Sequence, residues 1–298
     1  MENKERENDY RLERRLRAAA PDLNRRVTDC VTVLKQMLKF YATWFPNFTD
    51  HSVLHSMDVL DFCNRILGEQ AEELNAQECY ALIMACYLHD IGMGISEKDY
   101  RSFCEQPEMS LLRAEYPEGD DVQFIRDYHE EFSGLLIRKY AEVFEIPDEE
   151  LLFAIVQISR GHRKTDLFDA EAYPDIQTTE GVIRTAFLAA VLRLADEIDM
   201  GADRNPELLF DPSSLTTQHD IDVFGIHESI RKVEVQEDRI ILHVQPKESR
   251  YIPMIEETAE KIRKTLEYCR RAAEARSSLR IRQEKVGIEI IKTEEDPA

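Results

Sequence analysis

The sequence lacks an excess of positive charge. Its 38 lysine and arginine residues are outnumbered by 59 aspartate and glutamate residues, which gives a formal net charge of −21 at pH 7. Such an acidic chain repels a phosphate backbone, so extended binding of nucleic acid is disfavoured. A small phosphorylated substrate is still compatible with this composition wherever basic side chains gather locally.

Long hydrophobic runs and paired cysteines are also missing. No stretch approaches the roughly 18 apolar residues of a membrane-spanning helix, so we expect no membrane partner. The charged N-terminal stretch has no apolar segment of the kind that a secretory signal needs. The six cysteines form no Cys-x-x-Cys pair, and most lie among apolar residues as small core fillers. These absences predict a protein of the reducing cytoplasm.

Helical spacing of apolar residues dominates the first two thirds of the chain. The leading charged stretch reads as an exposed or frayed helix, and the apolar periodicity predicts further helices. Their predicted ranges are 27–45, a segment after 46–52, 77–89, 121–143, 148–159 and 181–199. We predict no strand before residue 220. Residues 93–120 read as a long irregular connection, which makes them a candidate lid over a substrate.

The pattern changes near residues 205–214. Residues 231–244 alternate as two strands, 253–275 form an amphipathic helix, and 286–292 form a final strand. We therefore predict a mainly α protein, with an all-helical domain over 20–210 and a small ββαβ-like α/β subdomain over 211–298. An open strand edge in this subdomain would allow two copies to pair, so a homo-oligomer is one expected state.

Two pairs of polar residues stand near the inward faces of the predicted helices. His51 and His55 are four residues apart and share a helix face, although a histidine near a helix start is often a surface or capping residue. His89 and Asp90 end the apolar run "ALIMACYL", and Gly92 permits the backbone to turn there. Burying Asp90 unpaired would be costly, and either a cation or a hydrogen-bond partner removes that cost.

Two further histidines can each be read in two ways. His129 lies on the apolar stripe of its helix, where a histidine taken alone reads as a satisfied core residue. His162 lies in "SRGHRKTD", a basic island within an acidic chain that includes Arg163 and Lys164. This island is either a solvated loop or a clamp for a phosphate.

Asp196 ends "IRTAFLAAVLRLAD", a helix that is apolar nearly all round. A buried aspartate needs a metal or a partner, and Arg193 one turn earlier could pair with it. Glu197 and Asp199 follow, and we expect them to point elsewhere.

Taken together, the order His, His-Asp, His, His, Asp resembles the HD-domain superfamily of metal-dependent phosphohydrolases. The matching stretches are "HSMDVL", "LHDIG", "HEEFSG", "GHR" and "RLADEID", and the resemblance covers about residues 27–205. The stretches "TDHSVLHS", "LHDIGMG" and "LRLADEIDMGADRNP" are especially similar to HD-type domains of bacterial stress and conflict systems. In some of those proteins the domain accompanies a chaperone-type ATPase. This chain shows no ATPase motif, so a stand-alone version is expected.

The resemblance implies an HD-type helical domain with a metal site in its middle. A first divalent metal would be held by His55, His89, Asp90 and Asp196. Asp90 would bridge to a second metal on His129 and His162; with one metal only, those two histidines would contact the phosphate or protonate the leaving group. The mixed ligand set suits Mn, Fe, Ni, Co or Zn better than Ca, and Mg is a further candidate.

The implied reaction is hydrolysis of a nucleotide or another small phosphorylated substrate by metal-activated water. The catalytic candidates are Asp90, His129 and His162, and the substrate-binding candidates are His51, Arg163, Lys164 and Arg204. Many members of the superfamily continue His-Asp-x-Gly with a lysine, whereas this chain has Met93, so one of the arginines or Lys164 would supply that charge. Two alternatives are a non-catalytic nucleotide-sensing or partner-binding module, and a helical scaffold whose polar residues only pack in the core.

Overall fold

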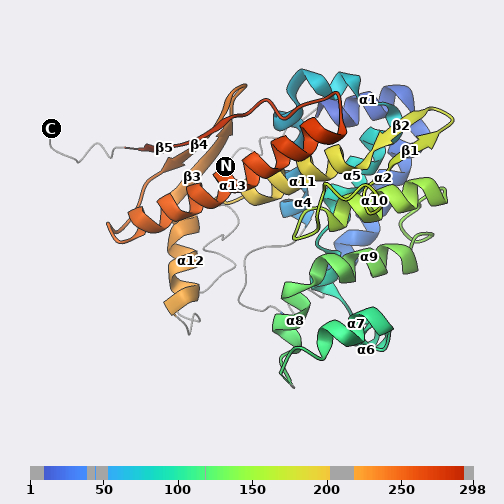
Figure 1. Ribbon diagram of the computed structural model, residues 1–298, viewed down its shortest axis with the longest axis horizontal. Helices are drawn as coiled ribbons and strands as arrows, with labels where there is room; N and C mark the ends of the chain where they lie inside the picture. Colours follow the sequence, from blue (N-terminus) through green and yellow to red (C-terminus); the bar gives the residue numbers. More distant parts are fainter. Residues whose placement is uncertain (1–9, 39–43, 45–52, 118, 202–217, 292–298) are drawn as a thin grey trace.

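The first two thirds of the chain fold into helices, which Figure 1 shows gathered on one side of a small sheet. The structure is a computed structural model that describes residues 10–38, 44, 53–117, 119–201 and 218–291. His51 and Arg204 lie outside the described residues. The helices of this part are α1 (Arg11–Ala19), α2 (Pro21–Met37), α4 (Val53–Leu67), η2 (Gly68–Glu73), α5 (Ala76–Leu88), η3 (Ile91–Gly94), α6 (Glu97–Cys104), α7 (Pro107–Arg113), α8 (Asp121–Asp127), α9 (His129–Lys139), α10 (Glu149–Arg160) and α11 (Thr185–Ile198).

Helix α5 is the centre of the helical part. Every residue from Glu78 to Leu88 is buried, because the segment is apolar on all sides and is packed by α1, α2, α4, α10 and α11. The helix begins with a capping box, in which Asn75 accepts from the Glu78 backbone N–H and Glu78 accepts from the Asn75 N–H. It ends at His89, so the packing of this one helix carries the His-Asp pair into the middle of the protein.

The leading helix is packed, which corrects the prediction of an exposed or frayed one. Leu12 and Leu16 of α1 are fully buried, and the backbone N–H of Leu12 donates to the Asn64 side chain at 3.0 Å. The cysteines behave as predicted, since five of them are buried and only Cys104 is partly exposed.

A β-hairpin precedes α11, so the prediction of no strand before residue 220 was wrong. Its strands are β1 (Asp175–Thr178) and β2 (Gly181–Arg184), which pair antiparallel. Four residues are too few for alternation to be visible in the sequence. The guanidinium of Arg184 holds the hairpin on α5 through hydrogen bonds of 2.6 and 2.7 Å to the buried carboxylate of Glu78. This hairpin is also why the helix predicted over 181–199 begins only at Thr185.

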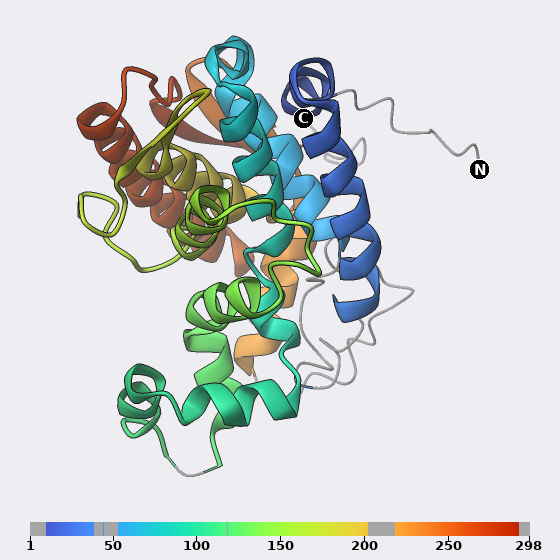
Figure 2. The ribbon, with the colours of Figure 1, turned by 90° about the vertical axis from the view of Figure 1, so that its right-hand side faces the viewer.

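Much of the segment 93–120 is helical, which corrects the prediction of a long irregular connection. It includes α6 and α7, and Ser96 caps α6 while Pro107 begins α7. The helix predicted over 121–143 is broken at Tyr128 into α8 and α9. Figure 2 shows α6 and α7 projecting away from the main body. Whether this unit covers a substrate stays a prediction.

The C-terminal part contains the predicted ββαβ unit. Strands β3 (Ile230–Val235) and β4 (Arg239–Val244) are antiparallel, and β5 (Lys285–Ile290) lies parallel to β4 in the order β3-β4-β5. Helix α13 (Tyr251–Arg276) connects β4 to β5 and also packs along α11 (Figure 1). A further helix, α12 (Gln218–Ser229), was not predicted. The boundary predicted at residues 210 and 211 falls outside the described residues and stays a prediction.

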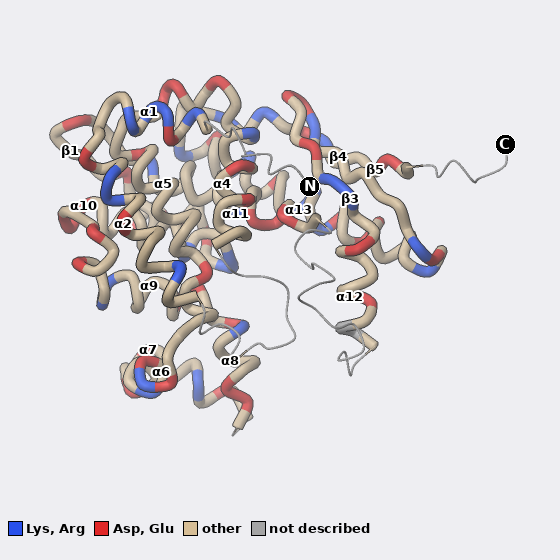
Figure 3. The backbone as a smooth tube through the Cα atoms, turned by 180° about the vertical axis from the view of Figure 1, so that it is seen from behind, with Lys and Arg blue, Asp and Glu red and all other residues tan. Residues whose placement is uncertain are grey.

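Charge is distributed mainly over the outer elements. Figure 3 shows lysine and arginine interspersed with aspartate and glutamate there, whereas α5 is almost free of charge. Within the described residues, no single helix is long and apolar enough to cross a membrane. One sharply bent pair, Ala76–Gly94 with Glu97–Cys104, meets that criterion by length and composition alone.

Candidate metal centre

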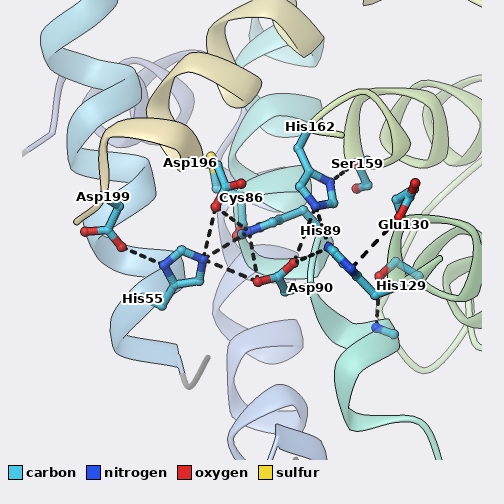
Figure 4. Close-up of polar contacts among 12 residues, drawn as sticks. His55, Cys86, His89, Asp90, His129, Glu130, Ser159, His162, Asp196 and Asp199 are labelled. Atoms are coloured by element: carbon cyan, nitrogen blue, oxygen red, sulfur yellow. Dashed lines mark hydrogen bonds and ion pairs between the residues drawn. The ribbon is translucent and has the colours of Figure 1, made fainter. Parts of the chain in front are cut away.

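The structure brings the six predicted ligands together in the middle of the helical part, as Figure 4 shows. His55 comes from α4, His89 caps the C-terminal end of α5, and Asp90 follows it before η3. His129 is the first residue of α9, His162 follows α10, and Asp196 lies in the last turn of α11. All four histidines and Asp90 are buried, and Asp196 is partly exposed.

One group consists of His55, His89, Asp90 and Asp196, whose ligand atoms all lie within 4.8 Å of one another. Nε2 of His55 is 3.2 Å from Nε2 of His89, 3.3 Å from Oδ1 of Asp196 and 3.4 Å from Oδ2 of Asp90. This is the spacing of donor atoms around a single ion of the size of a divalent transition metal.

The second group consists of Asp90, His129 and His162. Oδ1 of Asp90 is 3.2 Å from Nε2 of His129 and 3.4 Å from Nε2 of His162, and these two nitrogens are 2.9 Å apart. The two oxygens of Asp90 therefore face different groups. This is the arrangement of a carboxylate that could join two ions.

The outer nitrogen of each of the four histidines in this cluster has an acceptor. Nδ1 of His89, His129 and His162 lies 2.9, 2.7 and 2.5 Å from a backbone carbonyl, namely those of Cys86, Arg126 and Ser159. Nδ1 of His55 lies 2.6 Å from Oδ2 of Asp199. Carbonyls and ionised carboxylates only accept hydrogen bonds, so each Nδ1 carries a proton. In the neutral imidazole each Nε2 then carries a lone pair, which points toward the centre of the cluster.

The short distances between these unprotonated Nε2 atoms indicate whether the cluster suits a metal ion. Nε2 of His55 faces Nε2 of His89 at 3.2 Å, and Nε2 of His129 faces that of His162 at 2.9 Å. Two Nε2 atoms without protons cannot form a hydrogen bond with each other, and their lone pairs repel. A cation between them converts this repulsion into attraction. The cluster could therefore hold divalent metal, and its nitrogen and carboxylate donors fit a transition metal.

The protonation states agree with this assignment for His162 and Asp196. Burial lowers the pKa of His162 to about 4, which keeps its imidazole neutral at pH 7. Burial raises the pKa of Asp196, but the contacts of its Oδ1 with the imidazoles of His55 and His89 outweigh burial and hold that pKa well below its usual range; a cation among these atoms would act in the same direction. Burial also lowers the pKa of His129, whereas the Asp90 carboxylate raises it, and the net change is upward. A bound divalent cation would oppose that protonation.

Asp199 is a residue that the sequence prediction misplaced. It was expected to point elsewhere, but its carboxylate is buried and binds Nδ1 of His55. Asp199 stands three residues after Asp196, and residues three apart share a helix face, which is the signal that could have found it. Glu197 does point elsewhere, to Lys261 at 2.9 Å. Arg193 does not pair with Asp196; it donates instead to the carbonyls of Gly161 and Thr165.

Replacing Asp199 by alanine should lower metal affinity about 10- to 100-fold, because His55 loses the acceptor that fixes its ring and tautomer. Isothermal titration calorimetry of the metal-free protein with metal measures this affinity. Glu197→Ala is the matched control, since Glu197 lies in the same turn but pairs with Lys261. Equal affinity in the Asp199→Ala variant and the wild type would show that Asp199 does not orient His55.

Gly92 sets the position of the His-Asp pair relative to α9. Its backbone N–H donates to Oγ of Ser133 at 2.9 Å, and a Cβ built on it would lie 2.2 Å from the carbonyl oxygen of His129. Real atoms do not approach this closely, so only glycine allows η3 to pack against the first turn of α9. The same contact places Asp90 beside His129.

The basic island around His162 is divided in the structure. Arg160, which contributes to it, pairs with Glu131 at 2.6 Å. The Arg163 guanidinium is half-buried and makes no hydrogen bond or ion pair with any described residue, and its Nε is buried without a partner. Lys164 is exposed. Met93 is buried, so its side chain faces the core and not the substrate side of the cluster.

The comparisons with known proteins give one match. A model of the family described as HD-CE matches residues 45–278, which is well over half of the chain and includes the six candidate ligands. The match continues through α13 and so includes most of the C-terminal unit. Neither the curated proteins nor the solved structures give a match.

Proposed function

The chain belongs to the HD-CE family, an HD-domain-like family, and from this membership and the site geometry we propose that it is a metal-dependent phosphohydrolase. Its proposed substrate is a nucleotide or another small phosphorylated compound. The observation that carries the proposal is the arrangement of the four histidines, whose lone pairs face two common centres beside one shared carboxylate.

We propose that the two groups hold two ions, with Asp90 contributing one oxygen to each. His55, His89 and Asp196 would complete the first site, and His129 and His162 the second. When bound, such ions lower the pKa of water and polarise a phosphoryl oxygen. If only the first site fills, His129 and His162 would contact the phosphate or protonate the leaving group, which requires a proton on Nε2; against the effect of burial, the Asp90 carboxylate raises the pKa of His129 toward that form.

The residues of the chain supply the remaining requirements of phosphoester hydrolysis. The buried histidines and carboxylates hold their positions through fixed outer hydrogen bonds, so little reorganisation is needed when charge develops in the transition state. Arg163 is the cation best placed to bind substrate phosphate, because its guanidinium has no partner among the described residues and follows His162 directly. Lys164, His51 and Arg204 stay candidates for the same role.

The test is a phosphate-release screen with the full chain. Nucleoside mono-, di- and triphosphates and a phosphodiester would each be incubated with protein loaded with Mn, Fe, Co, Ni, Zn or Mg. We expect hydrolysis of at least one class, its loss on treatment with a chelator, and its return when metal is added back. A metal-loaded protein that binds nucleotides but hydrolyses none would favour the alternative, a nucleotide-sensing or partner-binding module, with which Met93 in place of lysine is compatible.

Substituting Arg163 by glutamine should lower kcat/KM about tenfold or more, mainly through KM. The reason is that the variant loses one charge-assisted hydrogen bond to phosphate, which is worth about 1.5–3 kcal/mol. Steady-state kinetics on the substrate found in the screen would measure it. Lys164→Gln is the comparison, and its effect should be smaller because Lys164 is exposed. A larger effect from Lys164→Gln would reverse the two assignments.

A further inference from the structure

Strand β5 is an edge strand whose outer side pairs with no other strand of the described part of the chain. The backbone N–H of Ile291 donates to the carbonyl of Val244 in β4 at 2.8 Å. The N–H and C=O groups of successive residues in a strand point to opposite sides. Those of Lys285, Gly287 and Glu289 therefore point toward β4, as those of Ile291 do. Val286 and Ile288 then turn their N–H and C=O groups outward, and the Val286 carbonyl indeed accepts from Arg263 at 3.3 Å.

The side chains of β5 alternate between two faces of the sheet. Val286 is buried on the face that packs against α13, as is its cross-strand neighbour Ile240 in β4. The other face carries Lys285, Gly287 and Glu289, and a Cβ on Gly287 would meet no atom within 4 Å. The strand ends with Ile290 and Ile291, which are 61% and 41% exposed. An edge of this kind, open and partly apolar, is usually protected or paired.

The charges on this strand are complementary to those of a second copy of it. In an antiparallel pair centred on Gly287, Lys285 of each copy lies opposite Glu289 of the other. These are the non-hydrogen-bonded positions, where side chains approach most closely. The outward groups of Val286 and Ile288 form the hydrogen bonds, and the Val286 carbonyl exchanges its 3.3 Å bond from Arg263 for one from Ile288 of the second copy. A shift by two residues would place Lys285 opposite Ile291 or Gly287 and would lose both ion pairs.

The residues that would meet are available for pairing. The side chain of Glu289 is 61% exposed. Within its own chain its carboxylate makes a long contact, 3.5 Å, with Nδ1 of His243. The Lys285 ammonium makes no hydrogen bond or ion pair with a described residue, and Lys285 is exposed. Gly287 adds no side chain at the centre, where the two strands cross the symmetry axis.

We propose that β5 joins two copies of this chain into a symmetric dimer through an antiparallel ladder centred on Gly287. Both three-stranded sheets then form one continuous sheet. The arrangement is isologous, because the same patch serves on both copies and each contact occurs twice. It leaves the metal centre unchanged, since that centre lies in the helical part.

The experiment measures the dimer dissociation constant by sedimentation equilibrium, for the full chain and for variants in which the charges of Lys285 and Glu289 are exchanged. Wild type should be a dimer. Lys285→Glu and Glu289→Lys should each raise the dissociation constant about tenfold, since two attractive pairs become two repulsive ones. The double variant, Lys285→Glu with Glu289→Lys, should return to the wild-type value. Glu180→Lys is the control, because it makes the same charge change at an exposed turn of the β1–β2 hairpin.

Three outcomes would overturn the proposal. They are a wild-type protein that stays monomeric at all concentrations, single variants that dimerise as well as wild type, and a double variant that fails to recover. Lys285 and Glu289 are exposed, so we expect every variant to fold, and circular dichroism of each variant checks this.

Discussion

Purified protein in which both His89 and Asp90 are replaced by alanine should contain no transition metal and release no phosphate. His89 supplies one ligand to the first group, and Asp90 supplies one oxygen to each group, so the double substitution leaves neither group with its full set. Elemental analysis by plasma mass spectrometry measures the metal, and the phosphate-release assay measures activity. Wild type should carry one or two equivalents.

A single substitution separates the two proposed ions. His162→Ala removes a ligand of the second group only, so we expect one equivalent of metal to be retained where wild type holds two. Thermal unfolding of each variant verifies that it folds. Full metal content or full activity in the double variant would refute the site. No metal in wild type, even after incubation with Mn or Fe, would return the cluster to the interpretation of polar residues packed in a helical core.

The substitution Gly92→Ala should destabilise the protein by about 3 kcal/mol or more, the upper range for a group forced into a filled space. The added methyl group would lie 2.2 Å from the His129 carbonyl and would displace the N–H of Gly92 from Ser133. Either the η3–α9 contact opens or the protein unfolds more readily. Urea unfolding measures the free energy, and metal content should fall with it because Asp90 moves away from His129.

Gly134→Ala is the control for this substitution. Gly134 lies in α9, and the atoms nearest to its added Cβ belong to the flexible side chain of Arg160, at 3.1 and 3.3 Å. Alanine is favoured over glycine within a helix by up to about 1 kcal/mol, so this variant should be close to wild type or slightly more stable. Equal stabilities for the Gly92 and Gly134 variants would show that the close packing at Gly92 is not needed.

The helices and the ligand order could be predicted because both depend on residue identity over long stretches. The apolar run of α5 and the order of histidines and aspartates are visible without any structure. The β1–β2 hairpin was missed because four-residue strands show no period, and it is held by the long-range pairing of Arg184 with Glu78. Helices α6 and α7 were missed because each is shorter than the window over which helical spacing can be recognised.

The outer contacts of the site were harder to predict than its candidate ligands. Asp199 was predicted to point away from the centre, although a residue three positions after Asp196 shares its helix face. The chain leaves the helix after Ile198, with ψ of 79° at Asp199, and the carboxylate reaches His55. The carbonyls that accept from the other three histidines carry no sequence signal, because every residue has one.

The candidate ligands are dispersed along the chain between residues 55 and 196, and no two of them except His89 and Asp90 are neighbours. An unfolded chain therefore does not bring these ligands together, and metal would bind almost exclusively to the native state. By mass action, free metal at 100 times its dissociation constant would add about 2.7 kcal/mol to the free energy of unfolding. Scarcity of metal would then shorten the life of the protein, since the apo form would expose cleavable segments more often.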